Sequence, residues 1–152
     1  MKEDLFQPSL TKEYEPTKTF NLGYLALIGF FGGVIPVLLM GKLNARWLKV
    51  DGILINLLMV LGILILAANT IVTGLYTYTD YEISSRLTRI IFRVASVVLA
   101  LLFARVMKPA YIKHLAADLP ITPMMPYVIG SILLSIIVGV SLSFAMLAVF
   151  KT

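Results

Sequence analysis

Three long stretches without a charged residue dominate this sequence of 152 residues. They cover Phe20–Gly41, Ile53–Thr77 and Tyr127–Phe150. The hydrocarbon core of a bilayer needs about 20 apolar residues in a helix, and each stretch meets that length. A soluble core of this size could not hide them, because hydrophobic residues make up 59% of the chain and charged residues only 14%. The sequence therefore predicts an all-α, polytopic integral membrane protein and argues against most soluble enzymes and ordinary nucleic-acid-binding domains.

A fourth apolar segment is interrupted by arginines. The stretch between Arg93 and Arg105 has only 11 uncharged residues, which is too short to cross a bilayer at a rise of about 1.5 Å per residue. A span over 87–107 would also include Arg89, whose long side chain could reach the interface as Arg105 could at the other end. We predict a full span here, with a re-entrant or surface helix as the alternative.

These segments predict an antiparallel bundle of four transmembrane helices, because the connections between them are short. Four spans place both termini on the same side of the membrane. Lysine and arginine divide almost equally between the two sides, so the positive-inside rule does not orient the chain. Six acidic residues on the side of the termini, against two opposite, slightly favour termini outside. The predicted parts are a polar tail over 1–19 and a membrane domain over 20–152, with helices near 20–41, 53–77, 87–107 and 127–150.

Small residues recur along one face of three of these helices. Helices in lipid associate where small side chains let the backbones approach closely, so these faces are predicted to pack. Pro36 lacks a backbone donor and predicts a kink in the first helix. The small residues would join helices within one bundle, or join the chain to a second copy or another membrane protein. The predicted packing residues are Gly29 and Gly33, then Ser96, Ala100 and Ala104, then Ser131, Ser135, Gly139 and Ser143.

A cluster of cations and polar residues supplies the candidate site. At 100° per residue, Arg86, Arg89 and Arg93 share one narrow face with the small residues of the helix predicted near 87–107, and an arginine inside the membrane needs a partner. No acidic residue lies inside any of the four segments, so three guanidiniums there would suit a lipid phosphate or a carboxylate. Two alternatives remain: snorkelling to headgroups, with Asp80 and Glu82 neutralising part of the charge, or docking of a protein partner. The candidate anion- or lipid-binding residues are Arg86, Arg89, Arg93, Asn69 and Thr73.

Residues for covalent or metal chemistry are scarce. The chain has no cysteine and one histidine, His114, which is predicted to lie in a loop. We therefore expect no catalytic residue, metal site or cofactor, and no enzyme activity.

The absence of catalytic chemistry beside clear packing faces predicts a non-catalytic accessory or stabilising subunit, or an immunity-type factor, that packs against another membrane protein. The alternative is a small dimeric transporter or lipid-binding protein that handles an anionic or phospholipid ligand through Arg93. The expected partners are the lipid bilayer, another membrane protein or a second copy, and an anionic lipid, with no nucleic acid. Phe31–Pro36 followed by Asn44–Lys49 resembles a pattern of small bacterial membrane proteins. The resemblance implies a multi-pass protein of a bacterial cell membrane and no particular activity.

Overall fold

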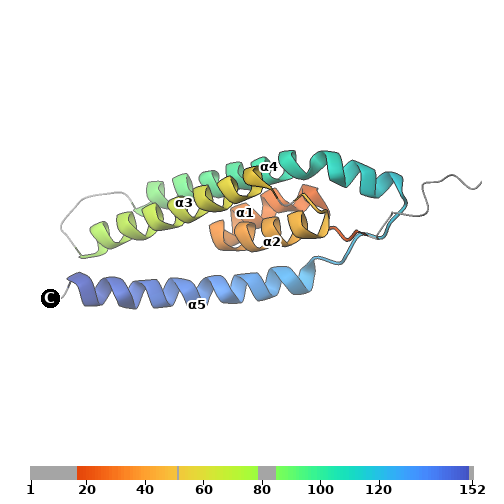
Figure 1. Cartoon of the computed structure of the whole chain (residues 1–152). Coiled ribbons are helices and arrows are strands. Elements are labelled where there is room, and N and C mark those ends of the chain that lie inside the picture. The colour runs from red at the N-terminus through yellow and green to blue at the C-terminus, as the bar shows by residue number, and fades with distance from the viewer. Residues whose placement is uncertain (1–16, 51, 79–84, 151–152) are drawn as a thin grey trace, which may run out of the picture.

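The computed structural model describes residues 17–50, 52–78 and 85–150, and in these ranges every regular element is a helix. Three long helices lie side by side, and two short ones fill the space between them over one half of their length (Figure 1). The predicted all-helical class is therefore confirmed for the described part of the chain. The elements are the 3-10 turn η2 (Leu22–Tyr24) and the helices α1 (Leu25–Gly32), α2 (Val34–Trp47), α3 (Ile53–Tyr78), α4 (Ser85–Ala116) and α5 (Met125–Phe150).

Three of these helices are long and apolar enough to cross a membrane, which supports the prediction of a membrane protein. The membrane-length segments are Ile53–Leu75 in α3, Arg86–Ala116 in α4 and Met125–Met146 in α5. Helices α3 and α5 begin and end within two residues of the ranges predicted from charge-free length.

Helix α4 is longer than its predicted range of 87–107. It runs for 32 residues to Ala116 and contains Pro109, so the prediction that the chain leaves the helix at Lys108 is wrong. A proline inside a helix removes one backbone hydrogen bond and bends the axis without necessarily ending it. Helix α4 changes direction in its C-terminal part (Figure 1). The connection to α5 therefore begins only after Ala116 and is shorter than expected.

The first apolar segment is not one span. It breaks at Gly33, whose backbone angles of φ 78° and ψ −160° fall in a region that is essentially restricted to glycine. Helix α1 has only 8 residues, about 12 Å of helix, and cannot cross a bilayer. Pro36 lies in the first turn of α2, where its missing N–H is tolerated, so it helps to start a helix instead of kinking one. A bundle of four spans is therefore not confirmed.

The two short helices form a hairpin that enters and leaves at the same end of the bundle. Gly29 of α1 lies against Ser96, and Thr17 is bonded to His114, so α1 runs antiparallel to α4. Helix α2 runs back in the opposite direction, because Gly41 lies against Phe103 and the later Asn44 contacts the later Met107. The start and end of the described chain consequently lie at opposite ends of the long helices (Figure 1), whereas four spans would have placed them together.

The buried core lies where this hairpin packs against the long helices. Val37, Leu99, Phe103 and Met107 are almost completely buried there. Two glycines that the sequence analysis did not single out allow the close approach. A Cβ on Gly41 would meet the ring of Phe103 at 2.9 Å, and a Cβ on Gly62 of α3 would collide with the side chain of Leu38.

A buried polar network, here called the polar clasp, fastens residues 17–20 to this core. Asn44 Oδ1 accepts hydrogen bonds from Thr19 Oγ1 at 3.0 Å and from the backbone N–H of Phe20 at 2.8 Å. Its Nδ2 donates to Met107 Sδ at 3.7 Å. The amide of Thr122 donates to the carbonyl of Thr19 at 2.8 Å. The network therefore joins the N-terminal segment to α2, α4 and the connection before α5.

His114 belongs to the same network, and its prediction as a loop residue is wrong. It lies in the last turn of α4 and is completely buried. Its Nε2 lies 3.4 Å from the carbonyl oxygen of Pro120, and its Nδ1 lies 2.7 Å from Thr17 Oγ1. A carbonyl only accepts, so Nε2 donates to Pro120, and Nδ1 shares a hydrogen bond with the Thr17 hydroxyl. The histidine thus holds the chain before α1 and the chain after α4 together.

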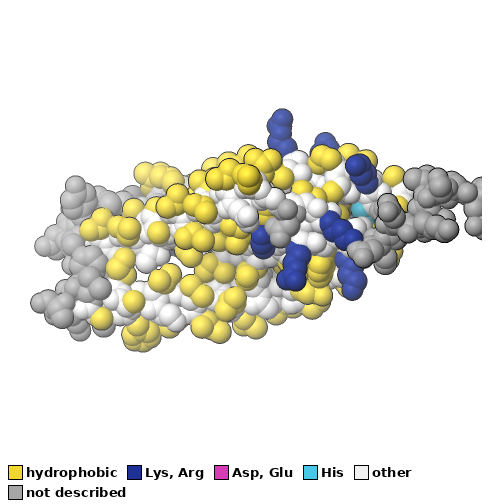
Figure 2. Space-filling view, in the orientation of Figure 1, with side chains coloured by type: hydrophobic (Ala, Val, Ile, Leu, Met, Phe, Trp, Pro, Cys, Tyr) yellow, Lys and Arg dark blue, Asp and Glu magenta, His cyan; other side chains and the backbone are white. Residues whose placement is uncertain are grey.

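Three aromatic rings and a group of cations mark the same end of the molecule. Phe20 lies 4.8 Å from Trp47 and 5.0 Å from Tyr127, measured between ring centroids. Tryptophan and tyrosine favour the interface between lipid and water. On the face seen in Figure 2, lysine and arginine side chains gather over the half that holds α1 and α2, and apolar side chains cover the other half.

Candidate functional site

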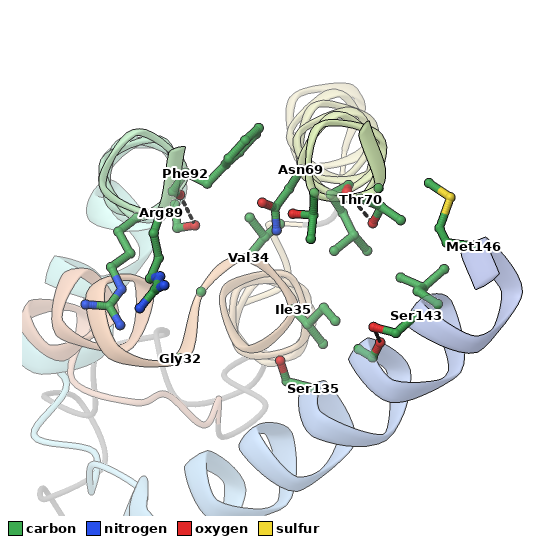
Figure 3. A pocket seen from close by; sticks show the side chains of 18 residues that line it. Gly32, Val34, Ile35, Asn69, Thr70, Arg89, Phe92, Ser135, Ser143 and Met146 are labelled. Carbon is green, nitrogen blue, oxygen red and sulfur yellow. Dashed lines mark hydrogen bonds between the residues drawn. The ribbon is translucent and has the colours of Figure 1, made fainter. Parts of the chain in front are cut away.

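A pocket of about 370 Å³ lies directly beyond the tip of the hairpin. Its floor is the turn over 32–35, and its walls come from α3, α4 and α5 (Figure 3). The hairpin stops about halfway along the long helices. Two contacts place it there: Gly29 packs against Ser96 of α4, and Leu38 packs against Gly62 of α3. The pocket is therefore the part of the bundle that the broken first segment leaves unfilled.

The α4 wall carries two of the candidate cations. Arg89 and Arg93 line the pocket and are exposed, whereas Arg86 is not among its lining residues. The guanidinium carbon of Arg93 lies 5.7 Å from the ring centroid of Phe30, within the range of a cation–π contact. Arg89 extends from α4 alongside α1 toward Gly32 (Figure 3). Both cations therefore lie at the side of the pocket where α4 meets α1.

The α3 wall supplies neutral polar groups. Asn69 and Thr73, both predicted for the site, line the pocket together with Thr70, which follows Asn69 in α3. The Thr70 hydroxyl donates to the carbonyl of Leu66 at 2.9 Å, an ordinary bond for a threonine inside a helix. Asn69 points across the pocket toward Val34 (Figure 3). The signal in the sequence is the position of Asn69, which lies one helical turn before Thr73 in an otherwise apolar helix.

The small-residue face of α5 lies largely in the pocket wall. Ser135, Gly139 and Ser143 all line the pocket, and Ser131, one turn earlier, is buried. A Cβ placed on Gly139 would meet no atom within 4 Å. The close helix contact expected at Gly139 is therefore not made within this chain, and the residue leaves space in the pocket wall. The Ser143 hydroxyl donates to the carbonyl of Gly139 at 2.9 Å.

The other predicted packing residues lie in or beside the hairpin. A Cβ on Gly29 would approach the carbonyl oxygen of Ser96 to 2.8 Å, so α1 and α4 approach closely at this point. Ala100 is completely buried, and Ala104 packs beside it. A Cβ on Gly33 would meet no atom within 4 Å, so the role of this glycine is the backbone turn between the two short helices.

The residues that line the pocket carry positive charge without a carboxylate. No aspartate or glutamate is among them, and Asp80 and Glu82, expected nearby, lie outside the described residues. The first N–H groups of α2, at Val34 and Ile35, have no acceptor within their own helix and add partial positive charge to the floor. Within the described ranges no cluster of histidine, cysteine or acidic residues could hold a metal ion. The electrostatics therefore suit an anion.

The remaining lining is apolar. Leu66, Phe92, Leu142 and Met146 surround the polar groups. A phosphate or carboxylate matches the planar fork of an arginine, and a hydrocarbon portion of the same molecule would contact the apolar wall. Comparison with known proteins does not indicate a ligand. No protein-family model matches the chain, and neither a curated protein nor a solved structure matches it.

Proposed function

We propose that this protein is a non-catalytic integral membrane protein that binds an amphiphilic oxyanion in the pocket beyond the hairpin. The ligand class is a phosphate or carboxylate attached to an apolar group. One observation carries the proposal. The guanidiniums of Arg89 and Arg93, the carboxamide of Asn69 and several hydroxyls line one pocket, and no carboxylate of the described residues lines it. Of the two functions expected from the sequence, this geometry favours the lipid-binding or transporting one.

The energetics of an arginine within the membrane support a bound anion. A charge at the bilayer centre costs roughly 2.5–3.5 kcal/mol on insertion scales, and two guanidiniums that share a pocket also repel each other. An oxyanion between Arg89 and Arg93 would relieve both penalties. Among the described residues, no histidine or carboxylate lines the pocket beside the hydroxyls to act as a base, which favours binding or movement of the ligand over its chemical conversion.

Exchange of Arg93 tests this function. The protein is reconstituted in nanodiscs of phosphatidylcholine with phosphatidylglycerol, and retained lipid is measured by native mass spectrometry. We expect wild type to retain phosphatidylglycerol, Arg93→Lys to retain less, because an ammonium lacks the fork, and Arg93→Leu to lose it. Arg105→Leu is the matched control, since Arg105 is also exposed on α4 but does not line the pocket. Equal lipid occupancy in all four proteins would exclude the site.

We further propose a membrane topology of three spans and a re-entrant hairpin, with the hairpin end in the cytoplasm. Of the lysines and arginines in the described residues, seven belong to the hairpin end and three to the pocket end. The positive-inside rule then places the hairpin end inside, the reverse of the slight preference for an outside N-terminus drawn from sequence. The seven are Lys18, Lys42, Arg46, Lys49, Arg105, Lys108 and Lys113, and the three are Arg86, Arg89 and Arg93.

Single cysteines test this topology cleanly, because the chain has none of its own. Cysteines at Lys18, Arg46 and Lys113 should all be protected from an impermeant maleimide in intact cells, and a cysteine at Arg86 should react. If Lys18→Cys and Arg46→Cys label from opposite sides, the first apolar segment crosses the membrane and the hairpin is wrong.

The exposed surface of α5 supports a second candidate, the accessory subunit. Only 6% of its membrane-length window is buried, against 28% for α4. Such a helix retains most of its surface for another membrane protein or a second copy. Native purification without crosslinker tests this role, and recovery of a monodisperse monomer would count against it.

A further inference from the structure

We infer that the pocket's ligand is a bilayer lipid with an anionic headgroup, and that it enters sideways between α4 and α5. This inference rests on the proposed oxyanion binding and adds the source of the ligand and its route. The route follows from which helices touch. In the described residues α3 contacts both α4 and α5, but α4 and α5 do not contact each other.

The hairpin closes the space between α4 and α5 only on its own side of the pocket. Both α1 and α2 contact α4 and α5. Helix α1 ends and helix α2 begins at the turn around Gly33, so neither extends beyond it. Figure 3 shows α5 and α4 on opposite sides of the pocket, with the hairpin between them. Beyond the turn no described helix fills the gap, so the pocket opens toward the acyl chains of the bilayer.

The chemistry along this opening changes from apolar to cationic. Leu142 and Met146 line the pocket on α5, and Phe92 lines it on α4 beside Arg89 and Arg93. A phosphate that reaches the arginines would leave its hydrocarbon chain against these apolar side chains. The volume of about 370 Å³ lies at the low end for small-molecule pockets, about 300–1,000 Å³. It suits a headgroup whose two acyl chains remain in the bilayer, as a lateral opening allows.

Two glycines of α5 provide a matched pair of variants that tests the route. Gly130 and Gly139 are both exposed, and a Cβ on either would meet no atom within 4 Å. Only Gly139 lines the pocket. Gly139→Phe therefore places a ring in the opening, and Gly130→Phe places the same ring elsewhere on the same helix, with space for the added Cβ at both positions.

The first arm measures phosphatidylglycerol retained by each variant after reconstitution in mixed phosphatidylcholine and phosphatidylglycerol nanodiscs. We expect Gly139→Phe to lower the apparent affinity by about tenfold, which corresponds to 1.4 kcal/mol, and Gly130→Phe to match wild type. Both variants are compared with wild type by thermal unfolding and gel filtration. Wild-type retention in Gly139→Phe would overturn lateral entry, and so would equal losses in both variants.

The second arm separates a lipid from a water-soluble anion. The protein is placed in nanodiscs of phosphatidylcholine alone and titrated with inorganic phosphate by calorimetry. We expect no saturable binding, and saturable binding of phosphate would overturn the bilayer source. Arg93→Leu distinguishes the two levels of the proposal: if it loses lipid while Gly139→Phe keeps it, only the lateral route fails, and if Arg93→Leu keeps lipid, the proposed function fails as well.

Discussion

Helix α1 lies against α4 with no room for a methyl group, so Gly29→Ala should weaken the fold. A Cβ at Gly29 would lie 2.8 Å from the carbonyl oxygen of Ser96 and 3.2 Å from Val37 Cγ2. The first distance is 0.6 Å short of the 3.4 Å at which ordinary contact begins. The carbonyl belongs to a helix backbone and cannot turn aside alone. The whole of α1 must therefore move away from α4.

The expected magnitude follows from two opposing effects. Overpacking of a well-packed site costs typically about 1–3 kcal/mol. Alanine favours a helix over glycine by about 1 kcal/mol, which offsets part of that loss. We therefore expect Gly29→Ala to lower the free energy of unfolding by up to about 2 kcal/mol. Gly139→Ala makes the same chemical change where no atom lies within 4 Å, and it should raise the free energy by up to about 1 kcal/mol.

Reversible unfolding in mixed micelles, as SDS is added and helical circular dichroism is followed, measures both variants on one scale. The reasoning depends on the order of the two midpoints. A Gly29→Ala midpoint equal to or above that of Gly139→Ala would show that α1 does not approach α4 as closely as described.

Four further substitutions test the turn and the polar clasp by the same unfolding measurement. Gly33→Ala should cost about 1–3 kcal/mol because of its backbone angles and not for lack of space, and Gly52→Ala, also in open space, should not; equal effects would remove the argument. Asn44→Ala should cost about 1–3 kcal/mol, because the buried N–H of Phe20 loses its acceptor; a cost within error of zero would mean that water replaces it. Thr17→Val and His114→Phe should each lower the free energy of unfolding. The double variant should lose less free energy than the two single variants together, since each substitution alone already removes the 2.7 Å bond between these side chains; additive losses would contradict that contact.

Hydrophobic length predicted the long helices and failed at the first segment for a physical reason. Residues 53–77 and 127–150 contain no backbone position that forces a turn, so counting apolar residues was sufficient. Counting cannot detect a reversal of direction, and Gly33 with Pro36 three residues later was interpreted as a packing glycine and a kink. The same pair is the signal for a turn followed by a helix start. The opposite error occurred at the end of the 87–107 segment. Helix α4 continues through Pro109 to Ala116, beyond its predicted end.

The candidate site was partly accessible from helical periodicity. The wheel for 87–107 placed Arg89 and Arg93 on one face, and both line the pocket with Asn69 and Thr73. Arg86 shares that face but lies in the first turn of α4, beyond the pocket. The pocket itself could not be predicted, because it exists only where the hairpin stops. The buried position of His114 was equally hidden, since it depends on contacts with Thr17 and Pro120, each distant from the other in sequence.

The hairpin has a consequence for how the protein is made. Helix α1 is 8 residues long, and an isolated segment of that length leaves half of its backbone N–H and C=O groups without partners in lipid. The close contact at Gly29 is made with α4, and the bonds of the polar clasp reach His114 of α4 and Thr122 of the connection after it, all of which are synthesised later. The contacts that hold the hairpin are therefore complete only once about residue 122 has been translated. A segment that is synthesised early thus reaches its final position only after α4 has been made.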